Sequence, residues 1–332
     1  MALYAFDGTG DEDTDRVSRD GNVLDFFRAY DGGPKNDDPS LRIGSLYLKG
    51  IGKRARSFVG DGPAQAFGVG GHRRVRQAID RLENNFEAGD SVVDVIGFSR
   101  GAALAVSFAN ELAGKCPRVI IRFMGLWDMV GQFGAPGRRF NAGHDLGMPP
   151  NVTRGYHAMA LDETRLAFPL TRLSETDPDN GRLLEVWFRG LHTDIGGGNG
   201  NRGINWISLN WLFENARRDG LPIDRTAILA NAADGELPQQ ISSHDAGDHC
   251  RTILTTDLLH TSVRLDGGRT ERPLNNPSTP LARIDDAGRV QEAVLATDAT
   301  MRRESLPAPV RDQVAAARSQ RGCSRDTRRH RP

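Results

Sequence analysis

The residues best suited to chemistry lie in the pentapeptide 97–101 (GFSRG), which matches the pattern Gly-x-Ser-x-Gly. Residues 91–98 before it are β-branched and almost all apolar, which predicts a buried strand, and the small residues 101–113 after it predict a helix. A serine at such a strand-to-helix turn is held in strained backbone geometry above the sheet, and helix N–H groups lie where an oxyanion would form. The sequence therefore predicts Ser99 as a nucleophile.

A serine needs a histidine to take its proton and a carboxylate to orient that histidine. Asp128 directly follows the apolar residues 119–127, at the end of an expected strand, where sites on parallel sheets gather. His192 follows the expected strand 185–188, within the glycine-rich sequence GLHTDIGGG. Three consecutive glycines suit backbone that approaches a ligand closely. We expect Asp128 to be the acid and His192 the base.

Two further residues compete for roles near this base. His260 follows the last apolar run, residues 252–259, where the base of a serine hydrolase on an α/β sheet often lies. The pattern favours His192 and leaves His260 as the alternative base. Asp194, two residues after His192, could cap the following segment or act as a second orienting carboxylate.

An oxyanion hole needs backbone N–H groups near the nucleophile. The short apolar strand expected at residues 3–6 ends in a turn that begins at Asp7, which we expect to order the turn through hydrogen bonds. The carboxylates of residues 11–15 are typical of a solvated loop, and we expect no metal and no cofactor. The candidate oxyanion donors are the backbone N–H groups of Arg100, Gly8, Thr9 and Gly10.

Strands and helices alternate over the first two-thirds of the chain. Strands are expected at residues 3–6, 45–49, 91–98, 119–127 and 185–188, and helices at residues 72–87, 101–113 and 204–217. This alternation predicts an α/β fold with a mainly parallel sheet and helices on both faces. After residue 224 the pattern loosens, and His157 is expected in or near a loop.

The length of 332 residues allows two domains, and one α/β domain with an appendage fits as well. We expect a catalytic core at residues 1–224, an extension of the core or a small cap at 225–300, and a frayed, Arg-rich tail at 301–332. The Gly- and Pro-rich residues 131–150 are expected to form a surface loop, either a lid or a substrate-access loop. The main expectation for the Arg-rich tail is a solvated end, and the alternative is contact with anionic lipid or nucleic acid.

Composition excludes several classes of protein. The 43 Lys and Arg balance the 43 Asp and Glu, which argues against a protein that coats nucleic acid, and we expect no specific nucleic-acid partner. The sequence has neither the basic and apolar regions of a secretory signal nor an apolar run of membrane-spanning length. We therefore expect a protein that is cytoplasmic as synthesised and exported, if at all, by a signal-independent route.

Four segments together resemble one known family: residues 6–9 (FDGT), 97–102 (GFSRGA), 127–131 (WDMVG) and 188–198 (FRGLHTDIGGG). It is the α/β-hydrolase family, long catalogued as a domain of unknown function, that includes phospholipase effectors of bacterial type VI secretion. The similarity spans residues 2–224 and implies an α/β-hydrolase-like fold. Carried over by position, it implies Ser99 as nucleophile, Asp128 as acid and His192 as base.

The chain departs from the family pattern in two places. Met129 stands where the family commonly has Thr, and the C-terminal region resembles no larger membrane-facing module of the secreted lipases. The difference in the C-terminal region argues against a lipid substrate more than it argues against ester hydrolysis. Residues 260–263 (HTSV) resemble a downstream family element, which keeps His260 in consideration. The partners implied are a small-molecule or lipid ester substrate, a membrane surface, and an immunity or secretion protein.

These observations favour a serine esterase or lipase, most readily a phospholipase, that works through an acyl-enzyme on Ser99. Two alternatives stay open at this point. One is a non-catalytic domain of the same fold that binds a partner through the same cleft. The other is a metal-dependent hydrolase, in which the carboxylates and the histidine would hold the ion, and which chelation would inactivate. The ligands of that alternative would be Asp7, Asp128, His192 and Asp194.

Overall fold

A computed structural model gives the fold of the chain. It describes residues 1–8, 20–36, 43–50, 63–131, 146–175, 180–233, 237, 239–242, 249–263, 275, 277 and 281–291. Thr9, Gly10, the acidic residues 11–15, most of the loop expected at 131–150 and the Arg-rich tail lie outside the described residues, so the expectations for them stay predictions.

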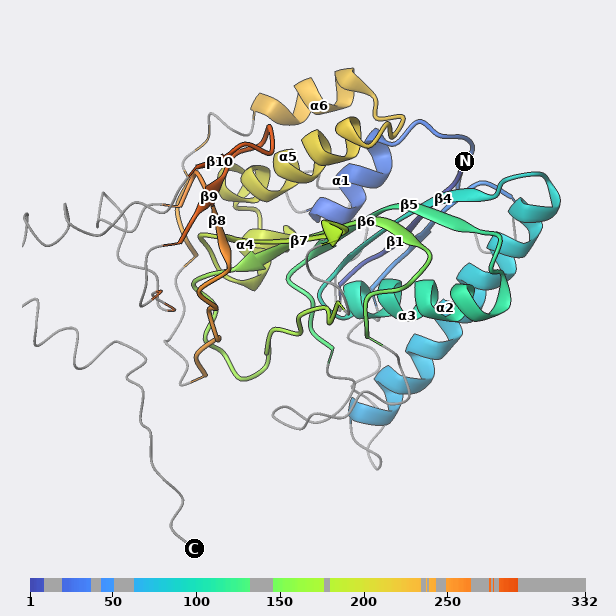
Figure 1. Cartoon of the computed structure of the whole chain (residues 1–332), viewed down its shortest axis with the longest axis horizontal. Coiled ribbons are helices and arrows are strands. Elements are labelled where there is room, and N and C mark those ends of the chain that lie inside the picture. The colour runs from blue at the N-terminus through green and yellow to red at the C-terminus, as the bar shows by residue number, and fades with distance from the viewer. Residues whose placement is uncertain are drawn as a thin grey trace, which may run out of the picture.

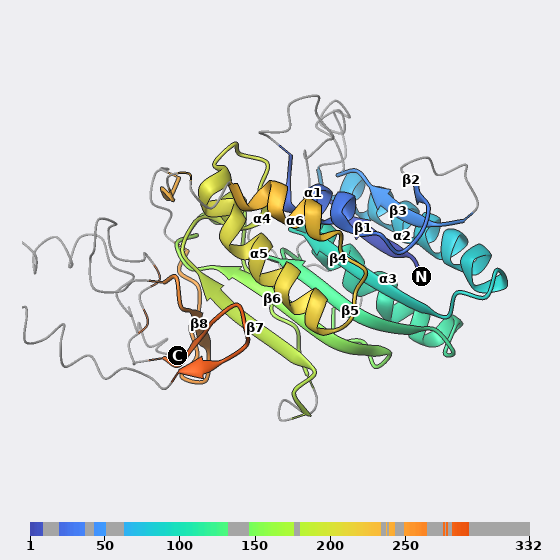
Figure 2. The same cartoon turned by 90° about the horizontal axis from the view of Figure 1, so that it is seen from above.

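The centre of the molecule is one twisted sheet whose order across the described strands is β10-β9-β8-β7-β6-β5-β4-β1-β3-β2 (Figures 1 and 2). All neighbouring strands pair in parallel except β9 and β10. The strands are β1 (Leu3–Phe6), β2 (Lys35–Asn36), β3 (Ser45–Leu48), β4 (Val92–Phe98), β5 (Ile120–Trp127), β6 (Val152–Ala160), β7 (Leu183–Phe188), β8 (Leu258–His260), β9 (Arg283–Ile284) and β10 (Val290–Gln291).

Helices cover both faces of this sheet. In Figure 1, α2 and α3 lie below it, and α1, α5 and α6 lie above it. The helices are α1 (Asn22–Ala29), α2 (Pro63–Glu87), α3 (Arg100–Lys115), α4 (His192–Gly196), α5 (Arg202–Arg218) and α6 (Arg225–Ala232). The expected α/β fold, with a mainly parallel sheet between two helical layers, is confirmed. None of the helices in the described ranges is long and apolar enough to cross a lipid bilayer.

The core explains why the central strands are apolar on both sides. Along β4, Val93 and Val95 pack with the residues of α2 and α3, whereas Ile96 and Phe98 pack with those of α1 and α5. A strand covered by helices on both faces buries every side chain, which gives a nearly continuous apolar run instead of alternation. This is why β4 and β5 stand out in the sequence.

The direction in which successive strands are added to the sheet reverses between β1 and β4. From β1 the chain passes through α1 to β2 and β3 on one side, and then through α2 to β4 on the other side. The carboxyl ends of the strands on either side of such a reversal border a crevice in which open α/β sheets bind their ligands. Ser99 follows β4 directly and therefore lies at this point.

Some sequence expectations need correction. His157 was expected in or near a loop, but it lies buried within β6. The sequence of β6, VTRGYHAMA, is interrupted by Arg154 and Gly155 and is fully buried only in its second half, so it has no continuous apolar run. α1 was not predicted at all, and α2 begins at Pro63 rather than at residue 72. Apart from these corrections, the region after residue 224, expected to be an extension of the core or a small cap, contributes β8, β9 and β10 to the same sheet.

Candidate active site

The turn between β4 and α3 has the geometry expected of a nucleophile. Ser99 has φ 57° and ψ −126°, a combination that residues other than glycine rarely adopt. Its N–H donates to the carbonyl of Trp127 at 3.0 Å, and its own carbonyl accepts from the N–H of Val130 at 3.1 Å. These bonds to the residues at the end of β5 hold the strained residue in place.

The two glycines of the pentapeptide are needed for close approach of the backbone. A Cβ at Gly97 would lie 2.7 Å from the Cα of Ala102, on the first turn of α3. A Cβ at Gly101 would lie 2.3 Å from the carbonyl oxygen of Phe6 and 2.5 Å from that of Asp7. Small residues therefore let α3 start directly beneath the turn and against the end of β1.

Replacing Gly101 by Ala is expected to destabilise the protein by about 3 kcal/mol, because the backbone at the end of β1 would have to move. Urea unfolding followed by circular dichroism measures this. Gly114→Ala in the last turn of α3 is the matched control, since nothing lies within 4 Å of its added Cβ. That variant is expected to be neutral or stabilised by up to about 1 kcal/mol. Equal effects of the two substitutions would contradict this account of Gly101.

The structure brings Ser99, His192 and Asp128 together from the ends of three strands. The Nε2 atom of His192 lies 2.8 Å from Ser99 Oγ, and its Nδ1 atom lies 2.6 Å from Asp128 Oδ2. Asp128 follows β5 with φ 39°, and His192 begins α4 shortly after β7. All three residues are buried. The arrangement is a continuous hydrogen-bonded chain from hydroxyl to imidazole to carboxylate.

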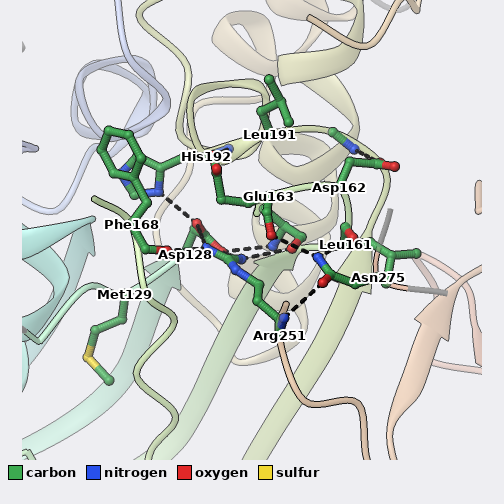
Figure 3. Close-up of polar contacts among 12 residues, drawn as sticks. Asp128, Met129, Leu161, Asp162, Glu163, Phe168, Leu191, His192, Arg251 and Asn275 are labelled. Atoms are coloured by element: carbon green, nitrogen blue, oxygen red, sulfur yellow. Dashed lines mark hydrogen bonds and ion pairs between the residues drawn. The ribbon is translucent and has the colours of Figure 1, made fainter. Parts of the chain in front are cut away.

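Two aromatic rings hold the imidazole of His192 in place. Phe98 lies with its ring centroid 4.6 Å away. Phe168 stacks on the imidazole at 4.4 Å (Figure 3). The guanidinium of Arg165 lies over the ring of Phe168 at 4.4 Å. Phe98 belongs to the motif itself, whereas Phe168 comes from the connection after β6 and was not singled out for this role from the sequence. The two rings restrict rotation of the imidazole.

The carboxylate of Asp128 accepts hydrogen bonds from four N–H groups of the described residues (Figure 3). One is the backbone N–H of Ala160, at 2.8 Å from Oδ1. Two come from the guanidinium of Arg251, at 2.6 Å from Oδ1 and 2.9 Å from Oδ2. The fourth comes from His192. Sequence reasoning missed Arg251, because it lies in a polar stretch with neither periodicity nor a motif.

The charges around this chain shift both of its titrating groups. Burial alone would raise the pKa of Asp128, but the guanidinium of Arg251 and the hydrogen bond from His192 outweigh burial and hold that pKa well below its ordinary value. Burial lowers the pKa of His192, against the opposing effect of Asp128, and Arg251 lowers it further. The site therefore holds an ionised carboxylate beside an imidazole that is neutral near pH 7.

At the end of β1, the carboxylate of Asp7 accepts two hydrogen bonds. Its Oδ1 accepts from the N–H of Gly8 at 2.8 Å, and its Oδ2 accepts from the hydroxyl of Tyr47. Burial, helped by the nearby charges of Asp20 and Asp25, raises the pKa of Asp7 to about 6 despite these hydrogen bonds. Of the expected oxyanion donors, the N–H of Gly8 is thus engaged with Asp7. Arg100 is the first residue of α3.

Asp194 ties segments of the chain together. Its carboxylate accepts from the N–H of Leu191 at 2.9 Å, from Asn199 Nδ2 at 2.8 Å and from Ser242 Oγ at 2.5 Å. The carboxylate beside the imidazole is that of Asp128, 2.6 Å from Nδ1. Of the two roles expected for Asp194, the geometry is that of a cap for the turn around α4.

His260 lies at the end of β8 with partners of its own. Its Nδ1 atom is 2.8 Å from Ser262 Oγ, its Nε2 atom is 3.3 Å from Asp286 Oδ1, and its ring stacks on Phe188 with centroids 4.6 Å apart. The position beside Ser99 is taken by His192. Within the described ranges, no three or more His, Cys, Asp or Glu side chains gather in a group suited to hold a metal ion.

Comparisons with known proteins place this geometry in context. The model of a family described as type VI secretion system (T6SS) phospholipase effector Tle1-like, catalytic domain, matches residues 3–115 and 107–215. Among solved structures, the chain is similar to an uncharacterized protein from Pseudomonas aeruginosa, with 20% identity and a TM-score of 0.48 over 73% of this chain and 48% of that one. It is also similar to the Tle1 effector bound to the VgrG spike from the type VI secretion system, with 21% identity and a TM-score of 0.42 over 59% of this chain and 50% of that one.

The chain thus spans about half the length of these two solved proteins. No protein of curated function matches it. The family match covers most of the region from β1 to α5, which includes Ser99, Asp128 and His192 but not Arg251.

Proposed function

The chain belongs to the family of type VI secretion phospholipase effectors with a Tle1-like catalytic domain, and from this premise we propose that it is a serine hydrolase that cleaves carboxylic esters of phospholipids. Ser99 is the proposed nucleophile, His192 the base and Asp128 the acid. The observation that carries the proposal is the hydrogen-bonded chain from Ser99 Oγ through His192 to Asp128. These residues are buried at the carboxyl ends of the strands, where the strand order reverses.

The proposed reaction follows from the proton positions in this chain. His192 accepts the proton of the Ser99 hydroxyl at Nε2 while the oxygen attacks the ester carbonyl. Asp128 accepts a hydrogen bond from the Nδ1–H group and stabilises the imidazolium that forms. His192 then donates its proton to the leaving alkoxide, which leaves an acyl group on Ser99. A water molecule then attacks the acyl-enzyme while His192 takes its proton, and His192 returns that proton to Ser99 Oγ as the fatty acid leaves.

The oxyanion of the tetrahedral intermediate needs backbone donors close to the nucleophile. The N–H of Arg100 is our candidate for the first donor, because Arg100 directly follows Ser99 and is the first residue of α3. Gly8, Thr9 and Gly10 remain the candidates for the second. Use of the Gly8 N–H requires that its hydrogen bond to Asp7 be exchanged for one to the oxyanion.

Membership of the family also guides our proposals about partners. We expect a secretion protein to deliver the chain, a membrane surface to present the lipid, and an immunity protein to neutralise it. The proposal places no metal or cofactor in the reaction. The catalytic core is proposed at residues 1–224.

The proposal is tested with the full chain, phospholipid vesicles and p-nitrophenyl esters, with and without EDTA. We expect release of free fatty acid that EDTA leaves unchanged, and a fluorophosphonate probe that labels Ser99 in a tryptic peptide. Loss of activity on chelation would favour the metal-dependent alternative. A folded protein that neither hydrolyses these esters nor reacts with the probe would favour a binding module and overturn the proposal.

The pH dependence of hydrolysis should report on His192. Because a general base acts only when unprotonated, and burial lowers the pKa of this imidazole from its ordinary 6.5, activity should persist below that pH. We expect kcat/KM to fall on the acid side as one group titrates, with a midpoint below pH 6.5. The measurement is a pH profile of fatty-acid release. A midpoint clearly above 6.5 would contradict the environment described for His192.

A further inference from the structure

The acid of the proposed triad has an unusual partner in Arg251. Its guanidinium approaches both oxygens of Asp128, and its side chain is only 2% exposed. It also donates to the carbonyl of Ala160 at 2.8 Å and to that of Phe168 at 2.9 Å. Through the second of these bonds, the same guanidinium that holds the acid also holds the residue whose ring stacks on His192.

The segment that carries Arg251 is fixed by a second residue, Asn275 (Figure 3). The backbone N–H of Arg251 donates to Asn275 Oδ1 at 2.8 Å. The amide of Asn275 in turn donates to the carbonyls of Leu161 and Glu163, at 2.9 and 2.8 Å. Arg251 is therefore tied through its backbone, as well as through its side chain, to the chain that follows β6.

From these contacts we propose that Arg251 is a positioning residue for the catalytic acid, which keeps Asp128 ionised and in the one orientation that serves His192. The inference rests on the proposed function, because Asp128 is the acid only if the chain is a serine hydrolase. Arg251 does not touch the serine or the reacting ester in this account. It acts through Asp128.

Geometry supports the orienting role. Each oxygen of the carboxylate has two donors: Oδ1 faces Ala160 and Arg251, and Oδ2 faces Arg251 and His192. A guanidinium that bonds both oxygens in parallel fixes the plane of the carboxylate as well as its position. A carboxylate held by Ala160 and His192 alone could turn about its terminal bond. The arginine thus keeps Oδ2 directed at Nδ1.

Charge supports the ionising role. A carboxylate as deeply buried as Asp128 would favour the protonated form in the absence of a cation. Among the described residues, the charged groups that act on the pKa of His192 include Asp128, Arg251 and Glu163. Glu163 Oε2 accepts the backbone N–H of His192 at 3.1 Å and is paired with Arg165 at 2.6 Å. Asp128 and Glu163 favour the imidazolium and Arg251 opposes it, so Arg251 also sets the pH at which the base becomes active.

The test compares Arg251→Gln, which removes the positive charge and the paired guanidinium donors, with Arg251→Lys, which keeps only the positive charge. Arg122→Gln is the matched control, because Arg122 also bonds both oxygens of a buried strand aspartate, Asp94, at 3.1 and 2.6 Å. The readouts are kcat and KM against pH, and the titration of the His192 ring by NMR of histidine-labelled protein without substrate. His192→Gln assigns the resonance.

For Arg251→Gln we expect kcat to fall about 100-fold with little change in KM, which is the size of effect seen when support of a catalytic group is lost. Its acid limb and the pKa of the His192 ring should both move up by about one unit, as expected on removal of a nearby like charge. Arg251→Lys should keep both values near those of the wild type while kcat falls about tenfold. Arg122→Gln should change neither kcat nor the titration.

An unchanged kcat and an unchanged ring titration in Arg251→Gln would overturn the proposal, and so would equal shifts in Arg122→Gln. If Arg251→Gln does not fold, a folded Arg251→Lys with wild-type kcat overturns it instead. Failure of the proposed function has a separate signature: wild-type protein that the fluorophosphonate probe does not label at Ser99. The ring titration needs no turnover, so it still reports whether Arg251 controls His192.

Discussion

Replacement of Asp128 by Asn is expected to lower kcat by about 10⁴-fold, the loss typical of a triad whose histidine is left in the wrong tautomer. The same change should cost roughly 3–5 kcal/mol of stability, because it leaves the buried charge of Arg251 without its partner. Few single substitutions combine losses of this size in both properties. The reason is that every donor around Asp128 is aimed at an anion.

An amide cannot satisfy these donors in either orientation. With its NH₂ group toward His192, it meets the Nδ1–H, so the ring must move its proton to Nε2 and can no longer accept one from Ser99. With its NH₂ group toward Ala160, it meets a backbone N–H that has lost its acceptor. In both orientations the NH₂ group also faces an N–H of Arg251.

Steady-state kinetics and urea unfolding of the same preparation measure the two losses. Asp94→Asn is the control: Asp94 is a buried strand carboxylate bonded by Arg122 and by the hydroxyl of Tyr30. That variant should lose stability and keep kcat. If Asp128→Asn kept kcat within about tenfold of the wild type, Asp128 could not be the acid of the triad.

Ser99→Ala should abolish hydrolysis, with a loss of about 10⁴-fold or more in kcat and no labelling by the fluorophosphonate probe. Stability should change by less than about 1 kcal/mol, because the hydroxyl bonds to the imidazole of His192 and the backbone of the turn is held by other bonds. The combination of lost activity and retained stability distinguishes a nucleophile from a structural serine.

A pair of histidine variants completes this experiment. His192→Ala should reduce kcat about as much as Ser99→Ala, because the residues of a triad act as a unit. His260→Ala removes a buried ring that stacks on Phe188, so it should lower stability while kcat stays within about threefold. The reverse outcome, with activity lost in His260→Ala and kept in His192→Ala, would give the base to His260.

The fold class and the position of the nucleophile could be predicted because both depend on residue types close together in the sequence. The apolar runs of β4 and β5 reflect burial on both faces, and Gly97 and Gly101 are small because backbone atoms lie where a Cβ would stand. Asp128 and His192 each directly follow an expected strand or its turn. In a parallel sheet the strand ends meet at one edge, so the sequence also indicated that these residues could be neighbours.

The tertiary structure alone decided which side chains support them. Arg251 lies 123 positions from Asp128, in a polar stretch beyond the proposed boundary at residue 224, and Phe168 lies in the connection between β6 and β7. The placement of His157 within β6 was equally invisible. Local sterics fix a turn or a strand within a few residues, and such preferences leave a periodic signal. Residues that come together only across the edge of the sheet leave no such periodic signal, because their distance is set by the fold of the whole chain.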